Sequence, residues 1–237
     1  MKSTSYIALA ALTGAAFLYG PLPTLAHRMT KPTLKKGEKP RMLLSFDDGP
    51  SPRNTPRLLD TLKEYQVPAV FFVLGDKARF YPQLVRRMVS EGHSVGFHAH
   101  VHRNQMMQNP ISATIDFERG LHTLRKLVGS VRFYRPPHGC FNVVSSLRAK
   151  SGGLIPLMWH RHVRDWKKQG VEELLEKLRE ARRPGAVLLL HDASDDTGGE
   201  PGAFDSMHEA LKIFLSESLE LGYDFVGADA VETEEGQ

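Results

Sequence analysis

Two adjacent carboxylates, Asp47 and Asp48, are the residues whose placement first suggests chemistry. They follow the apolar run RMLLSF and precede a Gly-Pro turn. Neighbouring carboxylates repel each other, so a cation or a proton is needed between them. Downstream, His98 and His102 lie four residues apart, and imidazole nitrogens are common ligands of divalent metals. One carboxylate with these histidines predicts a metal site, while the other stays free to accept a proton. We expect His100 to lie outside the ligand set.

Such a site supports hydrolysis, because a bound metal lowers the pKa of water and polarises a carbonyl group. The reaction also needs a base for the water proton and an acid for the leaving group. His191, after the run VLLL, is the candidate acid, and a core histidine at a strand end is the alternative. Arg135 can orient a carboxylate through paired hydrogen bonds, and Asp165 can hold an imidazole or a guanidinium. Taken alone, each of these last two is equally typical of a surface residue.

Short apolar runs alternate with amphipathic stretches along most of the chain, and this pattern must position those residues. Strands are predicted at 41–47, 69–75, 94–99, 131–136, 154–160, 186–192 and 224–228. Helices are predicted at 56–66, 81–92, 112–128, 171–182 and 206–222. Alternation of this kind predicts an α/β fold of about seven units with a parallel sheet, wound into a barrel or left open. The polar residues named above follow strand ends, where α/β folds build their sites.

The composition limits the class of protein. The chain has 237 residues and is 41% hydrophobic, which suits one substantial globular domain. A formal charge of +4 predicts weak attraction to anionic surfaces such as a cell wall or a membrane. Nucleic acid is not an expected partner, because the Lys and Arg residues are spread along the chain. The single cysteine, Cys140, excludes an internal disulfide and a cysteine-based metal cluster, and we expect it to serve packing.

The N-terminus predicts export. An apolar stretch of about 15 residues, shorter than a bilayer span, runs from Tyr6 to Gly20, and the small residues Thr24 and Ala26 follow. We expect a secreted, cell-surface or periplasmic protein, with a cleaved signal favoured over an uncleaved membrane anchor. The predicted parts are a signal or anchor at 1–26, a basic linker at 27–40, a catalytic domain at 41–230 and an acidic tail at 231–237.

Five motifs occur in a recognisable order: SFDDGP, HAHVH, RPPHG, RDW and LLHD. Together they resemble the polysaccharide deacetylase family, also called carbohydrate esterase family four or the NodB homology domain. The resemblance extends from about Met42 to Ala228. It implies a distorted (β/α) barrel of about seven strands with a groove for extended glycans. It also implies removal of acetyl groups from N- or O-acetylated sugars with one divalent ion, most often Zn²⁺, with Co²⁺, Ni²⁺ or Mn²⁺ as alternatives.

The resemblance also implies a role for each matching residue. The metal ligands would be Asp48, His98 and His102. Asp47 would be the catalytic base, positioned by Arg135. His191 would be the catalytic acid, and Asp165 would tune the acidity of His191. The substrate would meet the backbone N–H of His138 as an oxyanion donor, with Trp166 and Leu189 around the acetyl methyl group. Three positions depart from the family: Ser45 replaces a common Thr, His138 a common Tyr, and His162 a common Asp.

The sequence therefore predicts a monomeric, metal-dependent hydrolase that removes N-acetyl groups from amino-sugar polymers such as peptidoglycan or chitin-like glycan. The N-terminus would associate it with a membrane or cell wall. Three alternatives remain open: an O-acetyl (xylan) esterase with the same machinery, an amidohydrolase of small molecules, and a non-catalytic glycan-binding module.

Overall fold

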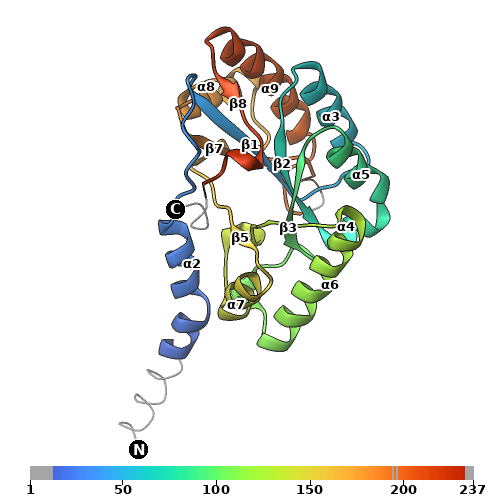
Figure 1. Cartoon of the computed structure of the whole chain (residues 1–237), viewed down its shortest axis with the longest axis vertical. Helices are drawn as coiled ribbons and strands as arrows, with labels where there is room; N and C mark the ends of the chain where they lie inside the picture. Colours follow the sequence, from blue (N-terminus) through green and yellow to red (C-terminus); the bar gives the residue numbers. More distant parts are fainter. Residues whose placement is uncertain (1–12, 194, 196, 233–237) are drawn as a thin grey trace, which may run out of the picture.

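The computed structural model describes residues 13–193, 195 and 197–232, and within them one parallel sheet forms the centre of the molecule (Figure 1). Its strand order is β5-β4-β3-β2-β1-β7-β6, and β8 pairs with β1. The strands are β1 (Arg41–Asp47), β2 (Ala69–Leu74), β3 (Ser94–Ala99), β4 (Phe133–Tyr134), β5 (Ile155–Pro156), β6 (Arg161–His162), β7 (Ala186–His191) and β8 (Asp224–Phe225). The sheet is curled, which confirms the predicted distorted barrel of parallel strands.

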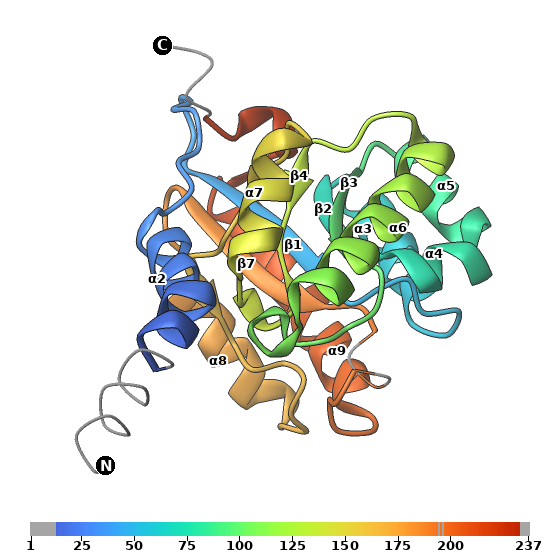
Figure 2. The same cartoon turned by 90° about the horizontal axis from the view of Figure 1, so that it is seen from below.

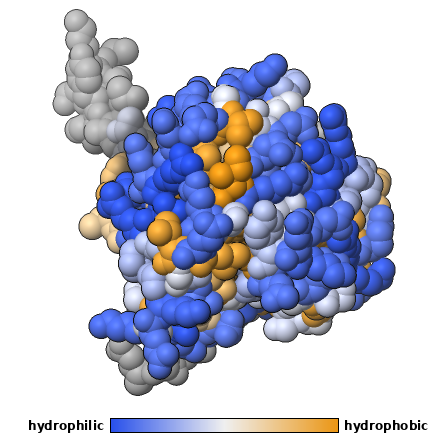
Figure 3. All heavy atoms as spheres, turned by 90° about the horizontal axis from the view of Figure 1, so that it is seen from above, coloured by the Kyte–Doolittle hydropathy of each residue, from blue (hydrophilic) through white to orange (hydrophobic). Residues whose placement is uncertain are grey.

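Helices cover the outside of the sheet (Figures 1 and 2). They are α2 (Pro21–Met29), α3 (Thr55–Glu64), α4 (Gly75–Phe80), α5 (Pro82–Ser90), α6 (Pro110–Val128), α7 (Val143–Ser151), α8 (Val171–Ala181) and α9 (Ala203–Glu220). Short 3-10 turns lie at Gln105–Met107, Pro137–Gly139 and Ala228–Ala230. The surface seen from above is mostly hydrophilic and is interrupted by apolar patches (Figure 3).

Strands β1, β2 and β7 form the buried middle of the sheet, since nearly every one of their residues is buried. Burial on both faces explains why these segments are almost continuously apolar in sequence. The register aligns Asp47 at the end of β1 with His191 at the end of β7. The central strands therefore bring two of the predicted site residues to the same edge of the sheet.

Several element boundaries differ from the sequence prediction. The predicted strand 154–160 is shorter than expected: β5 covers only Ile155–Pro156, and the chain then crosses to the other end of the sheet, where β6 forms without having been predicted. Helices α4 and α7 were not predicted; α7 begins at a capping box formed by Asn142 and Ser145. Helix α6 starts two residues earlier than expected because Asn109 caps it by accepting a hydrogen bond from the Ser112 amide.

The N-terminal part of the described chain lies against the domain. Helix α2 contains Ala26, so the predicted end of a signal or anchor falls inside this helix. Beyond it, Leu34 forms an antiparallel bridge with Val231. Among the described residues, no helix is long and apolar enough to cross a membrane. Residues 6–12 of the apolar stretch and residues 233–237 of the acidic tail lie outside the described residues.

Candidate functional site

The carboxyl ends of the central strands border a pocket of about 530 Å³. Eight of the ten site residues predicted from the sequence line it: Asp47, Asp48, His98, His102, His138, Trp166, Leu189 and His191. The other two, Arg135 and Asp165, are buried and contact lining residues from behind. The structure thus brings together side chains that are spread over more than half of the sequence.

The backbone at Asp48 explains how two successive carboxylates reach one pocket. In a regular strand, consecutive side chains point to opposite faces of the sheet. Asp48 follows the last residue of β1 and has a φ of 78°, in the left-handed region. This conformation breaks the alternation, so Asp47 and Asp48 both line the pocket. Aspartate tolerates it better than most residues do.

Asp48, His98 and His102 form a cluster that fits a metal ion. Oδ1 of Asp48 is 3.2 Å from Nε2 of each histidine, and it is buried without a hydrogen-bond partner. Nδ1 of His98 donates a 2.7 Å hydrogen bond to the Arg135 carbonyl, which leaves a lone pair on its Nε2. One ligand atom from each of the three residues lies within 4.8 Å of the others. The donor set of two imidazoles and one carboxylate is typical of zinc and similar ions.

Electrostatics favour the ligand forms of these side chains. Burial alone would raise the pKa of Asp48, but its close contact with His98 and the nearby imidazoles of His191 and His102 lower it well below its usual range. Burial lowers the pKa of His102 to about 4, so its imidazole is neutral at pH 7. An ionised carboxylate beside a neutral imidazole is the state that binds a cation. His100, as expected, does not line the pocket; its backbone amide binds Asp116 instead.

Asp47 is held by Arg135. Nη1 of Arg135 donates to Oδ1 of Asp47 at 2.7 Å, and the same nitrogen donates to the hydroxyl of Ser45 at 2.9 Å. The guanidinium also lies 4.0 Å from the centre of the Phe72 ring. The second oxygen of Asp47, Oδ2, is 4.0 Å from Nε2 of His98 and therefore faces the three-residue cluster. The pair fixes one carboxylate oxygen and presents the other to the pocket.

His191, at the end of β7, is paired with Asp165. The two oxygens of Asp165 accept a 2.7 Å bond from the His191 amide and a 3.0 Å bond from its Nδ1. Burial alone would lower the pKa of His191, but the charge and hydrogen bond of Asp165 raise it to about 9. The imidazole is thus protonated at neutral pH, and its Nε2 is not occupied by Asp165.

Aromatic side chains and a tight turn form another part of the pocket wall. Trp166 contacts His191 edge-on at 5.2 Å between ring centres and also lies against His162, at 5.4 Å. His138 sits in a tight turn with a φ of 58°, and Gly139 follows with a φ of 59°. A Cβ on Gly139 would lie 2.6 Å from the Trp159 ring, so only glycine fits there. As expected, Cys140 is a buried free thiol, and burial raises its pKa.

The pocket is also lined by residues that the sequence did not single out, among them Arg28, Lys31 and Thr197. The Thr197 hydroxyl donates to Oδ2 of Asp48 at 2.5 Å, although 149 positions separate the two residues. No motif spacing signals such a contact, because Thr197 lies on an irregular loop between β7 and α9. Arg28 and Lys31 belong to a segment whose composition suggested only a solvated linker.

Comparisons with known proteins agree with this geometry. A family model described as "Polysaccharide deacetylase" matches residues 34–156. A chitooligosaccharide deacetylase of Sinorhizobium fredii is 37% identical over 161 residues, which cover 65% of this chain and 72% of that protein. A peptidoglycan-N-acetylglucosamine deacetylase of Bacillus cereus is 32% identical over 185 residues, or 77% and 84% of the two chains.

Solved structures show the same fold. The peptidoglycan N-acetylglucosamine deacetylase Bc1960 superposes with a TM-score of 0.73 at 26% identity, covering 87% of this chain and 94% of that one. The peptidoglycan deacetylase PdaC from Bacillus subtilis gives a TM-score of 0.71 at 26% identity, covering 81% and 89%.

Proposed function

The chain belongs to the polysaccharide deacetylase family, and from that premise we propose that it removes N-acetyl groups from an amino-sugar polymer of the cell envelope. It is a deacetylase that depends on a metal ion. The observation that carries the proposal is one pocket that holds the Asp48, His98 and His102 cluster beside two buried pairs, Asp47 with Arg135 and His191 with Asp165. The names of its relatives, which include chitooligosaccharide and peptidoglycan deacetylases, support the substrate class.

Asp48, His98 and His102 would hold the ion, and we propose Zn²⁺, which suits two imidazoles and a carboxylate. When bound, such an ion activates water and polarises the acetyl carbonyl. Asp47 is the proposed base. Since its Oδ1 is engaged by Arg135, its Oδ2, which faces the cluster, takes the proton from the attacking water.

His191 is the proposed acid on the other side of the scissile bond. Its pKa of about 9 keeps it protonated at neutral pH, so it can give a proton to the departing amine. Asp165 holds the ring through Nδ1 and thereby directs Nε2 at the leaving group. The backbone N–H of His138 would stabilise the oxyanion, while Leu189 and Trp166 would surround the acetyl methyl group.

We also propose that the enzyme works outside the cytoplasm and associates with the envelope through its N-terminus. Three apolar side chains, spaced to fall on one side of α2, are exposed: Leu22 (42%), Leu25 (51%) and Met29 (73%); Leu18, which precedes this helix, is exposed as well (57%). They continue the apolar run that begins at Tyr6. Exposed apolar side chains on one side of a helix are typical of a surface that meets lipid. Detergent-dependent extraction of the full chain from the membrane fraction would support this placement, and recovery in the soluble fraction alone would oppose it.

Acetate release from a defined panel tests the proposed reaction. We expect the purified full chain, loaded with Zn²⁺, to release acetate from N-acetylglucosamine oligomers or peptidoglycan strands, with free amine appearing by mass spectrometry. Acetylated xylan and small acylated amines serve as the comparison substrates. Activity confined to acetylated xylan would instead identify an O-acetyl esterase, and activity confined to small amides would identify an amidohydrolase. If metal-loaded protein turns over none of these substrates, the remaining function is glycan binding without catalysis.

A further inference from the structure

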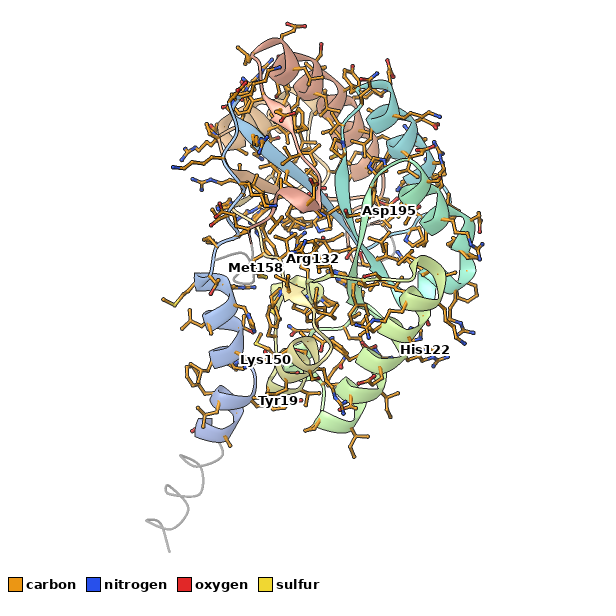
Figure 4. All side chains as sticks on the ribbon, in the orientation of Figure 1. Tyr19, His122, Arg132, Lys150, Met158 and Asp195 are labelled. Carbon is orange, nitrogen blue, oxygen red and sulfur yellow. The ribbon has the colours of Figure 1, made fainter. Side chains whose placement is uncertain are left out.

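Helix α2 is attached to the loop that forms one wall of the pocket. The hydroxyl of Thr24, which is buried, donates to the carbonyl of Phe141 and accepts from its amide, both at 2.9 Å. The His27 ring stacks on the Phe141 ring with 3.9 Å between centres. At the far end of the segment, the Tyr19 hydroxyl donates to the Gln108 carbonyl at 2.9 Å (Figure 4). These contacts fix the position of the segment relative to the pocket.

This attachment brings two cations to the mouth of the pocket. Nη2 of Arg28 donates to the His138 carbonyl at 2.9 Å, and its Nε donates to the Gly139 carbonyl at 3.3 Å. Nζ of Lys31 donates to the Trp159 carbonyl at 3.4 Å. Backbone carbonyls orient both side chains without neutralising them. Both residues line the same pocket as the Asp48 cluster.

Neither cation has an acidic partner in the described part of the chain. Among those described residues, no Asp or Glu oxygen lies within ion-pair distance of Arg28 or Lys31. The pocket's own carboxylates, Asp47 and Asp48, are buried and engaged by Arg135 and by the imidazoles. Within the same described residues, no hydrogen bond involves Nη1 of Arg28. Two exposed positive charges with unused donors therefore face the entrance of the pocket.

We propose that Arg28 and Lys31 bind carboxylates of the substrate, so that the enzyme prefers an acetylated amino-sugar polymer that carries carboxylates over a neutral one. This inference rests on the proposed deacetylase function. A guanidinium presents paired donors that match a carboxylate, and an ammonium adds a second positive charge. A peptidoglycan strand without its peptides has this chemistry, because every second sugar then bears a free lactyl carboxylate; a chitin-like strand has none. The cations would bind the sugar beside the one that is deacetylated.

Two matched tetrasaccharides test the proposal. One alternates N-acetylglucosamine with N-acetylmuramic acid, free of peptides, and the other is the same molecule with its lactyl carboxylates converted to methyl amides. For wild-type enzyme we expect kcat/KM to favour the carboxylate form, mainly through KM, and to lose that preference as salt is raised. Arg28→Gln and Lys31→Gln should each reduce the ratio of the two kcat/KM values about fivefold, the range of an exposed ion pair. Arg28→Lys should restore part of it.

Lys36→Gln is the control, since it removes the same charge from the same segment at an exposed residue that does not line the pocket. The ratio should stay at its wild-type value in this variant. An unchanged ratio in both Arg28→Gln and Lys31→Gln would overturn the proposal.

Binding separates this inference from the proposed reaction. Calorimetry with the Asp47→Asn variant should show tighter binding of the carboxylate tetrasaccharide than of the amide, and Arg28→Gln in that background should remove the difference. If no oligomer releases acetate but this difference persists, the proposed reaction fails and the carboxylate site stands. If acetate is released and the two tetrasaccharides bind equally, the carboxylate site fails and the reaction stands.

Discussion

Arg135 donates a 2.7 Å hydrogen bond from Nη1 to Oδ1 of Asp47, and both side chains are almost fully buried. The contact joins β1 to the segment that follows β4, across 88 positions of sequence. The two oxygens of Asp47 therefore differ: Oδ1 accepts the bond that fixes the side chain, and Oδ2 faces the pocket. The first two predictions concern this pair.

Replacing Asp47 by Asn should abolish turnover while leaving the metal bound. The amide keeps the size of the side chain but cannot accept the water proton, and general-base catalysis contributes about 10²–10⁴-fold. Acetate release should fall by about that factor, and elemental analysis should still give one ion per chain. Turnover equal to wild type in this variant would refute Asp47 as the base. Loss of the ion together with activity would make Asp47 a ligand instead.

Replacing Arg135 by Met should destabilise the protein by about 3–5 kcal/mol, because it leaves the Asp47 carboxylate buried without its partner. Urea unfolding measures the change. Arg86→Met is the matched control, since Arg86 is exposed, and it should alter stability by less than about 0.5 kcal/mol. The double variant Asp47→Asn with Arg135→Met should recover part of the loss. No recovery would mean that the packing of Arg135 against Phe72, and not its charge, supplies the stability.

Removing the metal should eliminate activity and lower the unfolding temperature. A ligand that binds only the folded state stabilises it, so chelation removes that contribution. Zn²⁺ added back should restore both, while Asp48→Ala should fail to regain either. His122→Gln provides the control, because His122 lies on the outer side of α6 (Figure 4) and should leave metal content unchanged. Full activity after exhaustive chelation would contradict the metal dependence of the proposed mechanism.

The pH dependence of kcat and of stability should reflect the pairing of His191 with Asp165. The pKa of His191 is raised to about 9 from an ordinary value near 6.5, so its pairing stabilises the fold fully below about pH 6.5. That stability is lost as the pH rises through 9, and the protonated acid is lost with it. In Asp165→Asn the alkaline limb of kcat should therefore move to lower pH. Stability should fall at pH 6 but little at pH 10.

Asp229→Asn is the control for this profile, because Asp229 is exposed. It should leave the alkaline limb where it is in the wild type. An alkaline limb that is the same in Asp165→Asn and wild type would rule out His191 as the acid.

Thr24→Val should detach helix α2 without removing much volume. It leaves the amide and the carbonyl of Phe141 without their partner, at a cost of about 1–3 kcal/mol for a buried unpaired group. Hydrogen exchange across residues 19–31 should become faster, and KM for the carboxylate tetrasaccharide should rise. Leu25→Ala, on the exposed side of the same helix, should change neither. Exchange that is equally slow in Thr24→Val would show that other contacts hold the helix.

The sequence predicted the central strands and the clustered residues well. Strands β1 and β3 have the predicted bounds, because their apolar runs end at polar residues that must leave the buried sheet. The Asp48, His98 and His102 cluster could be anticipated since parallel strands deliver their ends to one edge. The order of Asp47 and Asp48 could not be decided from residue types alone. The structure places Oδ1 of Asp48 3.2 Å from both imidazoles, at a residue whose left-handed φ is not encoded by spacing.

Contacts made by irregular segments were not predictable. The run from Leu154 to His160 is apolar enough to suggest a single strand, yet only Ile155–Pro156 forms one, and the chain then crosses to the opposite edge of the sheet to form β6. The basic segment after residue 26 has the composition of a solvated linker. Its Arg28 is fixed by two backbone carbonyls, those of His138 and Gly139, and carbonyls leave no signature in sequence.

The attachment of helix α2 has a practical consequence for anyone who produces this enzyme in a heterologous host. A shortened version that starts after Ala26 would lack Thr24, and with it the hydrogen bonds to Phe141 that anchor the entrance wall. Such trimming would release the segment that holds Arg28 at the pocket, so the shortened form should discriminate less between charged and neutral glycans than the full chain does.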